Sequence, residues 1–247
     1  MTGTTQVYQK RTFYKTANDN AKTTILFLHG WGGNADSFDS VFFRLAQTHR
    51  VVSLDLWGFG KSDPPDGWDV ATYARYVREF LRLQNLCEIF VVAHSFGGRV
   101  AAVLNDLEPN LIQKLILTDS AGIRPKRSFK KTCRILRYKW KKLCKKVFPK
   151  TDLSRYGSAD YRALPECMRS TFVKVVKEDL TAYFRRIRCP TLLLWGGEDA
   201  ETPLYMAKKI KKCLTDGALI VFPHCGHFAY LEESEQFFRI AACFLGD

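Results

Sequence analysis

The sequence predicts an α/β fold in which a mostly parallel central sheet is flanked by helices and carries a helical insert. Three observations lead to this prediction. Six short apolar runs alternate with segments of helical spacing, which is the pattern of βα units. The apolar runs are continuous, so both faces of the sheet are expected to be covered by helices. The excess positive charge is confined to one stretch, which separates an insert from a framework.

The six apolar runs are expected to form the parallel strands, and a seventh run is expected to form an antiparallel edge strand. In chain order, the parallel strands are predicted at 24–29, 50–56, 89–94, 114–119, 190–195 and 218–222, and the edge strand at 7–14. Apolar residues recur with helical spacing between these strands, at 37–48, 70–84, 96–107, 203–213 and 232–245. The order of these elements predicts one sheet between two layers of helices.

Composition and cysteine usage limit the class of protein. A chain of 247 residues that is 46% hydrophobic can bury a core without disulfides or a structural metal. Residues 1–24 are polar and hold no signal-peptide core, and no apolar run approaches the roughly 18 residues of a membrane span. The eight cysteines are scattered, with no C-x-x-C pair. We therefore expect a cytoplasmic protein with reduced thiols.

The net charge of +13 lies in one part of the chain. Residues 122–188 hold 21 Lys and Arg against 5 Asp and Glu, whereas the rest of the chain holds 17 against 20. This boundary predicts a core formed by 1–121 and 189–247 and a basic helical lid at 122–188. Within the lid, one helix is predicted over 129–147 and a second over 165–186. The first helix has an apolar face with steps of three and four residues, formed by Phe129, Cys133, Leu136, Trp140, Leu143 and Val147.

The strongest chemical signal is a serine at the end of the strand predicted at 89–94. Residues 92–98 read V-A-H-S-F-G-G, so Ser95 has small residues, Ala93 and Gly97, two positions away on each side. A strand-to-helix turn of this kind strains the backbone, and small neighbours relieve the crowding. The turn exposes the hydroxyl at a helix N-terminus, where backbone N–H groups can bind an oxyanion. The alternative is a serine that only caps the helix.

Two further sites follow later strands. Asp199, next to Glu198, ends the run L-L-L-W-G-G-E-D, and His227 lies in the run P-H-C-G-H-F. A turn acid or a loop histidine alone is weak evidence of function. A serine nucleophile, however, needs a base that a carboxylate orients, and the order Ser, acid, His is that of a hydrolase triad on a parallel sheet. The run 224–227 lacks distant metal-ligand partners, so no metal is expected. A triad of this kind also requires no organic cofactor.

With these motifs, and with H-G-W-G-G at 29–33 and D-L-W-G-F-G-K-S at 55–62, the sequence resembles the α/β-hydrolase superfamily over essentially the whole chain. The resemblance implies a structural turn at 55–62. It implies three catalytic residues, Ser95, Asp199 and His227. It also implies an oxyanion hole made by the backbone N–H groups of Trp31 and Phe96. Asp119, which follows its own strand, is the fallback acid, because some members of the superfamily carry the acid there.

The resemblance limits the reactions that this protein is expected to catalyse. Dehalogenases and epoxide hydrolases of this fold use Asp as the nucleophile, and Ser95 speaks against both. Carbon–carbon bond hydrolases of ring-fission products often have Asn before the serine and Trp after the histidine, where this chain has His94 and Phe228. Proline iminopeptidases usually carry G-G-S-W-G. The sequence is therefore expected to encode a serine esterase or thioesterase. The alternatives are a carbon–carbon bond hydrolase and a non-catalytic receptor of this fold, although receptors usually lose a triad member.

The basic lid has two interpretations. Charge runs are usually solvated faces, so the lid helix could cover the pocket while its lysines face water. Alternatively, the positive field attracts an anionic substrate or partner. The candidates are an acidic acyl carrier protein, an anionic membrane surface, and a small anionic ester or thioester. Pimeloyl-acyl carrier protein methyl esterase is a similar case, because the lid of that enzyme binds an acidic carrier protein. No nucleic acid is expected, since no nucleic-acid-binding module accompanies the charge, and the sequence predicts no oligomeric state.

Overall fold

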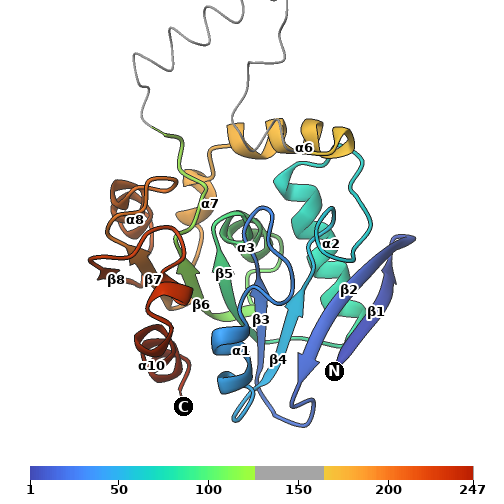
Figure 1. Cartoon of the computed structure of the whole chain (residues 1–247), viewed down its shortest axis with the longest axis horizontal. Helices are drawn as coiled ribbons and strands as arrows, with labels where there is room; N and C mark the ends of the chain where they lie inside the picture. Colours follow the sequence, from blue (N-terminus) through green and yellow to red (C-terminus); the bar gives the residue numbers. More distant parts are fainter. Residues whose placement is uncertain (126–163, 247) are drawn as a thin grey trace, which may run out of the picture.

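The computed structural model describes residues 1–125 and 164–246, which form an eight-stranded sheet covered by helices (Figure 1). The strand order is β1-β2-β4-β3-β5-β6-β7-β8, and β3 to β8 run parallel while β1 and β2 are antiparallel. The strands are β1 Thr2–Val7, β2 Lys10–Ala17, β3 Thr24–Leu28, β4 Arg50–Leu54, β5 Ile89–His94, β6 Ile112–Thr118, β7 Thr191–Gly196 and β8 Gly217–Phe222. The prediction of a mostly parallel sheet flanked by helices is confirmed.

Helices bury both faces of the sheet. They are α1 Asp39–Leu45, α2 Val70–Leu83, α3 Phe96–Leu107, α6 Glu166–Lys177, α7 Thr181–Phe184, α8 Leu204–Lys211, α9 Ala229–Glu232 and α10 Ser234–Leu245. Side chains alternate between the faces along each strand. In β3, Ile25 and Phe27 join the core formed with α1, α9 and α10, whereas Leu26 and Leu28 join the core formed with α2, α3, α7 and α8. No helix in the described ranges is both long and apolar enough to cross a membrane.

The N-terminal edge of the sheet differs from the prediction. We expected one strand at 7–14, but the structure has a hairpin in which β1 and β2 pair from Thr2↔Lys15 to Val7↔Lys10. The turn residues Tyr8 and Gln9 have φ values of 46° and 64°. Two successive residues with positive φ are typical of a type I′ hairpin turn, whose usual sequence signal is Asn-Gly or Asp-Gly. The Tyr-Gln pair lacks that signal, so the prediction of a single strand was wrong.

The described part of the insert also differs from the prediction. The helix expected over 165–186 is two helices, α6 and α7, because the chain leaves helical geometry at Glu178, where ψ is 131°. The second helix begins at Thr181, whose backbone N–H donates to Asp179 Oδ1 at 3.0 Å. In Figure 1, α6 crosses the upper end of the fold, and its Phe172 ring lies 5.1 Å from the Trp31 ring. The helix predicted over 129–147 lies outside the described residues.

Candidate active site

Ser95 occupies a strained turn between β5 and α3. Its φ and ψ are 47° and −107°, a conformation that is uncommon for a residue with a side chain. Neighbouring backbone fixes the turn, because Ser95 N–H donates to the Thr118 carbonyl at 3.1 Å and Ala121 N–H donates to the Ser95 carbonyl at 3.0 Å. A Cβ atom at Gly97 would lie 2.1 Å from the Leu28 carbonyl oxygen. The residue two positions after Ser95 therefore has to be a glycine if α3 is to approach β3 this closely.

The loop that follows β3 lies against this turn. Phe96 is the first residue of α3, so its N–H has no partner within the helix. The Trp31 ring packs edge-on against the Phe96 ring, with centroids 5.2 Å apart. A Cβ atom at Gly30 would lie 2.5 Å from His94 Nδ1, which shows how closely the loop approaches the serine turn. The structure thus brings together the two backbone segments that were predicted to bind an oxyanion.

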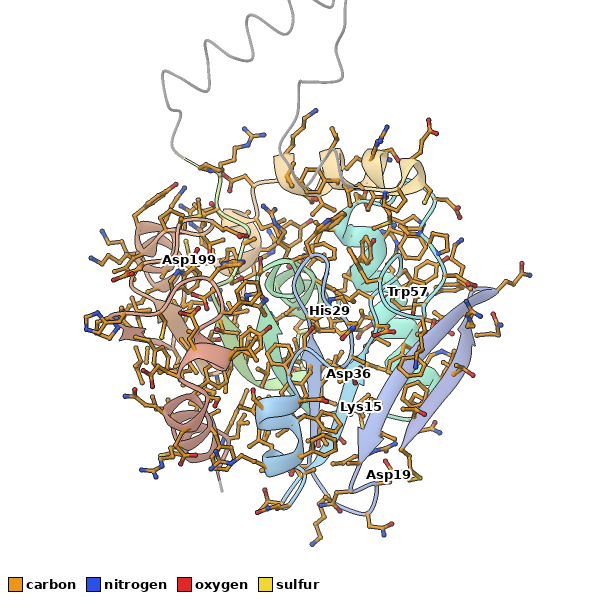
Figure 2. The ribbon with its side chains drawn as sticks, viewed as in Figure 1. Lys15, Asp19, His29, Asp36, Trp57 and Asp199 are labelled. Atoms are coloured by element: carbon orange, nitrogen blue, oxygen red, sulfur yellow. The ribbon has the colours of Figure 1, made fainter. Side chains whose placement is uncertain are left out.

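Asp199 and His227 form a direct hydrogen bond. His227 Nδ1 donates to Asp199 Oδ2 at 2.9 Å. Thr202 Oγ1 donates to the same oxygen, while the backbone N–H groups of Glu201 and Thr202 donate to Asp199 Oδ1 at 2.8 and 2.9 Å. The side chain of Asp199 is 0% exposed and that of His227 is 8% exposed. These hydrogen bonds fix the carboxylate in the orientation that holds the imidazole. In Figure 2, Asp199 lies in the half of the fold nearer to α6.

The electrostatics of the pair follow from these contacts. Burial alone would raise the pKa of Asp199, but the hydrogen bonds from His227 and Thr202 outweigh it and hold that pKa below its ordinary value. Burial alone would lower the pKa of His227, but the hydrogen bond to Asp199 and the nearby negative charges raise it. An ionised carboxylate beside a basic imidazole is the arrangement that general-base catalysis requires.

His94 connects the serine turn to the histidine loop. Its Nε2 donates to the His227 carbonyl at 2.8 Å, and the two imidazole rings lie 4.7 Å apart. Burial lowers the pKa of His94 to about 3, so its ring is neutral. The sequence had not indicated this contact, and neither had it indicated the roles of Thr202 and Glu201. The sequence signal that could have indicated the His94 contact is the position of His94 directly before Ser95.

The other two candidate acids have different partners. The buried Asp119 has φ 45°, and its Oδ1 accepts from the Gly196 N–H at 2.8 Å. Burial raises the pKa of this carboxyl to about 7. The Glu198 carboxylate is exposed and lies 4.0 Å from His224 Nδ1. Among the acids in the part of the chain that the structure describes, Asp199 is therefore the one that accepts a hydrogen bond from His227 Nδ1.

Comparison with known proteins gives consistent matches. A model of the alpha/beta hydrolase family matches residues 25–240. The sequence is 27% identical over 242 residues to 2-hydroxy-6-oxo-6-(2'-aminophenyl)hexa-2,4-dienoic acid hydrolase of Metapseudomonas resinovorans, covering 90% of this chain and 83% of that protein. It is 28% identical over 239 residues to pimeloyl-[acyl-carrier protein] methyl ester esterase of Neisseria meningitidis, covering 88% and 91%. The solved esterase of Exiguobacterium antarcticum shares the fold, with a TM-score of 0.80 at 21% identity over the full length of both chains.

Proposed function

Because the chain belongs to the alpha/beta hydrolase family, we propose that it is a serine hydrolase that cleaves a carboxylic ester or thioester through an acyl-enzyme. The main observation behind this proposal is the hydrogen bond of 2.9 Å between His227 Nδ1 and Asp199 Oδ2. The loop that carries His227 is joined to the strained Ser95 turn by the hydrogen bond from His94 Nε2 to the His227 carbonyl. The similarity to a methyl ester esterase over 91% of its length supports the choice of reaction.

In the proposed mechanism, Ser95 Oγ attacks the carbonyl carbon of the substrate while His227 Nε2 takes the hydroxyl proton. Asp199 holds the imidazole in the required tautomer and stabilises the imidazolium. The N–H groups of Trp31 and Phe96 would donate to the oxyanion of the tetrahedral intermediate, and one such donor is typically worth about 3 kcal/mol. The proton then passes from His227 to the leaving alcohol or thiol, and water hydrolyses the acyl-enzyme by the same steps.

The test is the loss of turnover when the nucleophile is removed. We expect Ser95→Ala to lower kcat on a short p-nitrophenyl ester by about 10⁴-fold or more, because a triad without its nucleophile retains little catalysis. Fluorophosphonate labelling should be lost in the same variant. Ser170→Ala, which changes an exposed serine on α6, serves as the control and should behave like the parent.

Full turnover by Ser95→Ala would contradict the proposal. A parent protein that is inert both to an ester and thioester panel and to the fluorophosphonate would instead favour the non-catalytic receptor.

Carbon–carbon bond hydrolysis is the second candidate reaction. It is favoured by the similarity to the Metapseudomonas resinovorans hydrolase, which is named for a 6-oxo dienoic acid substrate. This chain has His94 and Phe228 at the positions where Asn and Trp are frequent in such enzymes, and this difference favours hydrolysis of an ester or thioester. Turnover of a ring-fission product in preference to every ester and thioester of a common panel would reverse this ranking.

We further propose that residues 122–188 form a basic lid that attracts an anionic substrate, an acidic carrier protein or an anionic membrane surface. Its 21 Lys and Arg against 5 Asp and Glu support this proposal. The similarity to an esterase that is named for an acyl-carrier-protein substrate also supports it.

A further inference from the structure

His227 has a second carboxylate neighbour. Glu201 Oε2 lies 3.4 Å from His227 Nε2, on the opposite edge of the ring from Asp199. The two carboxylates differ in environment, because the Glu201 side chain is 70% exposed whereas that of Asp199 is fully buried. One imidazole therefore has a buried carboxylate at Nδ1 and a solvated carboxylate at Nε2.

The same turn that orients Asp199 also places Glu201. Asp199 Oδ1 accepts from the backbone N–H groups of Glu201 and Thr202 at 2.8 and 2.9 Å, so the backbone of residue 201 is fixed two positions after the buried acid. Thr202 Oγ1 closes the turn through its hydrogen bond to Asp199 Oδ2. The exposed Glu201 side chain, in contrast, can change rotamer. Its carboxylate can therefore reach or leave His227 without any movement of the backbone.

The protonation state of His227 decides what this contact does. A neutral ring that donates from Nδ1 to Asp199 presents a lone pair at Nε2, and a carboxylate oxygen gains nothing there. A protonated ring presents an N–H at Nε2 and is attracted to Glu201. In the proposed mechanism, Nε2 is the atom that takes the proton of Ser95. Glu201 and Ser95 thus require the same ring atom in different protonation states.

We propose that Glu201 is a positioning residue that holds protonated His227 by Nε2 and competes with Ser95 for that atom. This inference rests on the proposed serine-hydrolase function. In the free protein, whenever His227 is protonated, the imidazolium then lies between two carboxylates. Loss of the proton releases Glu201 to solvent and leaves Nε2 available to Ser95.

Among the described residues, three charged or titratable groups besides Glu201 act on His227. They come from the segments after β6 and β7 and from the end of β5, and they are Asp119, Asp199 and His94. Glu232 accepts from the backbone N–H groups of Gly226 and Phe228, the neighbours of His227 in the chain. Asp199 and Asp119 act in the same direction as Glu201 and raise the pKa of His227. Because these groups are unchanged when residue 201 alone is replaced, a substitution there isolates its contribution.

The matched pair of variants is Glu201→Gln and Glu198→Gln. Both residues belong to the loop after β7 and have similar exposure, at 70% and 69%, but the Glu198 carboxylate lies near His224 rather than His227. We expect Glu201→Gln to move the acid limb of the pH profile of kcat/KM to lower pH. On the acid side, kcat/KM should exceed the parent value by about threefold, as for an exposed ion pair. Glu198→Gln should follow the parent, and added salt should reduce the difference.

A second measurement does not depend on turnover. Titration of the His227 ring protons by NMR should show a lower midpoint in Glu201→Gln than in both the parent and Glu198→Gln. An unchanged midpoint, or equal shifts in the two variants, would overturn the inference. A lower midpoint in Glu201→Gln, in a protein that cleaves no ester or thioester and does not react with the fluorophosphonate, would keep the contact and overturn the serine-hydrolase proposal instead.

Discussion

At the scale of single residues, hydrogen bonds distinguish two buried carboxyl groups near His227. Asp199 accepts from His227 Nδ1, whereas Asp119 accepts from Gly196 N–H and from Thr118 Oγ1. We expect Asp199→Asn to lower kcat by up to about 10⁴-fold, because the amide favours the wrong imidazole tautomer. Asp119→Asn should have a mild effect, since an amide oxygen still accepts from Gly196. Steady-state kinetics on folded variants would check this, and the reverse ranking would make Asp119 the orienting acid.

The residues around the site differ in how far sequence could predict them. Ser95 and His227 stand in short motifs whose residue types and spacing indicate a catalytic role, and that role stays a prediction until it is tested. Glu201 and His94 carry no such motif, because their contacts with His227 join segments that are distant in the chain or depend on the rotamer of one side chain. Thr202 was not predicted either, because its contact with Asp199 Oδ2 depends on the geometry of the turn after β7.

At the scale of elements, α3 approaches β3 closely at Gly97. The Cβ atom of an alanine at position 97 would lie 2.1 Å from the Leu28 carbonyl oxygen, and both partners are backbone. We expect Gly97→Ala to lower the free energy of unfolding by about 1–3 kcal/mol, as overpacking does. Urea denaturation would measure the change.

Gly226→Ala is the control for this prediction. The nearest atom to a Cβ atom there is Glu232 Oε1 at 3.4 Å, at the end of a flexible side chain. This variant should keep the parent's stability. Equal losses in the two variants would show that contact with the Leu28 carbonyl is not the cause.

Element boundaries were predicted well where the apolar pattern is strong and poorly where a turn decides them. Helix α3 was predicted at 96–107 and begins and ends there, because its buried face is continuous. The hairpin of β1 and β2 was missed, since Tyr8 and Gln9 adopt positive φ without a glycine or asparagine. The break between α6 and α7 was also missed. There the Arg99 side chain donates to the Glu178 carbonyl at 3.0 Å, a contact between distant segments that periodicity does not reveal.

At the scale of the whole molecule, the concentration of positive charge in residues 122–188 predicts that anionic substrates are attracted electrostatically. We expect kcat/KM for an anionic ester to exceed that for a matched neutral ester by about tenfold at low salt. This preference should fade as screening shortens to about 10 Å near 0.1 M salt. It should also fade when four basic residues of the insert, which lie outside the described residues, are replaced together by Gln. These are Lys130, Arg134, Lys141 and Lys145.

The control replaces the same number of positive charges outside the insert. Helix α8 and the residue after it carry four lysines, Lys208, Lys209, Lys211 and Lys212. Replacing all four by Gln should preserve most of the preference in kcat/KM for the anionic ester over the neutral one. Salt curves that are flat for both esters, or equal losses in the two quadruple variants, would mean that the charge of the insert does not steer small anions.

The packing of α1 against α10 has a consequence for how the chain is made. Residues 39–45 and 234–245 lie on the same face of the sheet, although most of the chain separates them. During synthesis, β3 and α1 emerge long before α10, so the apolar face that carries Phe27 and Phe42 lacks that helix until all eight strands of the sheet have been translated. An incomplete chain therefore exposes this surface to other nascent chains and to aggregation. Chaperones that bind apolar segments would act on this protein at that stage.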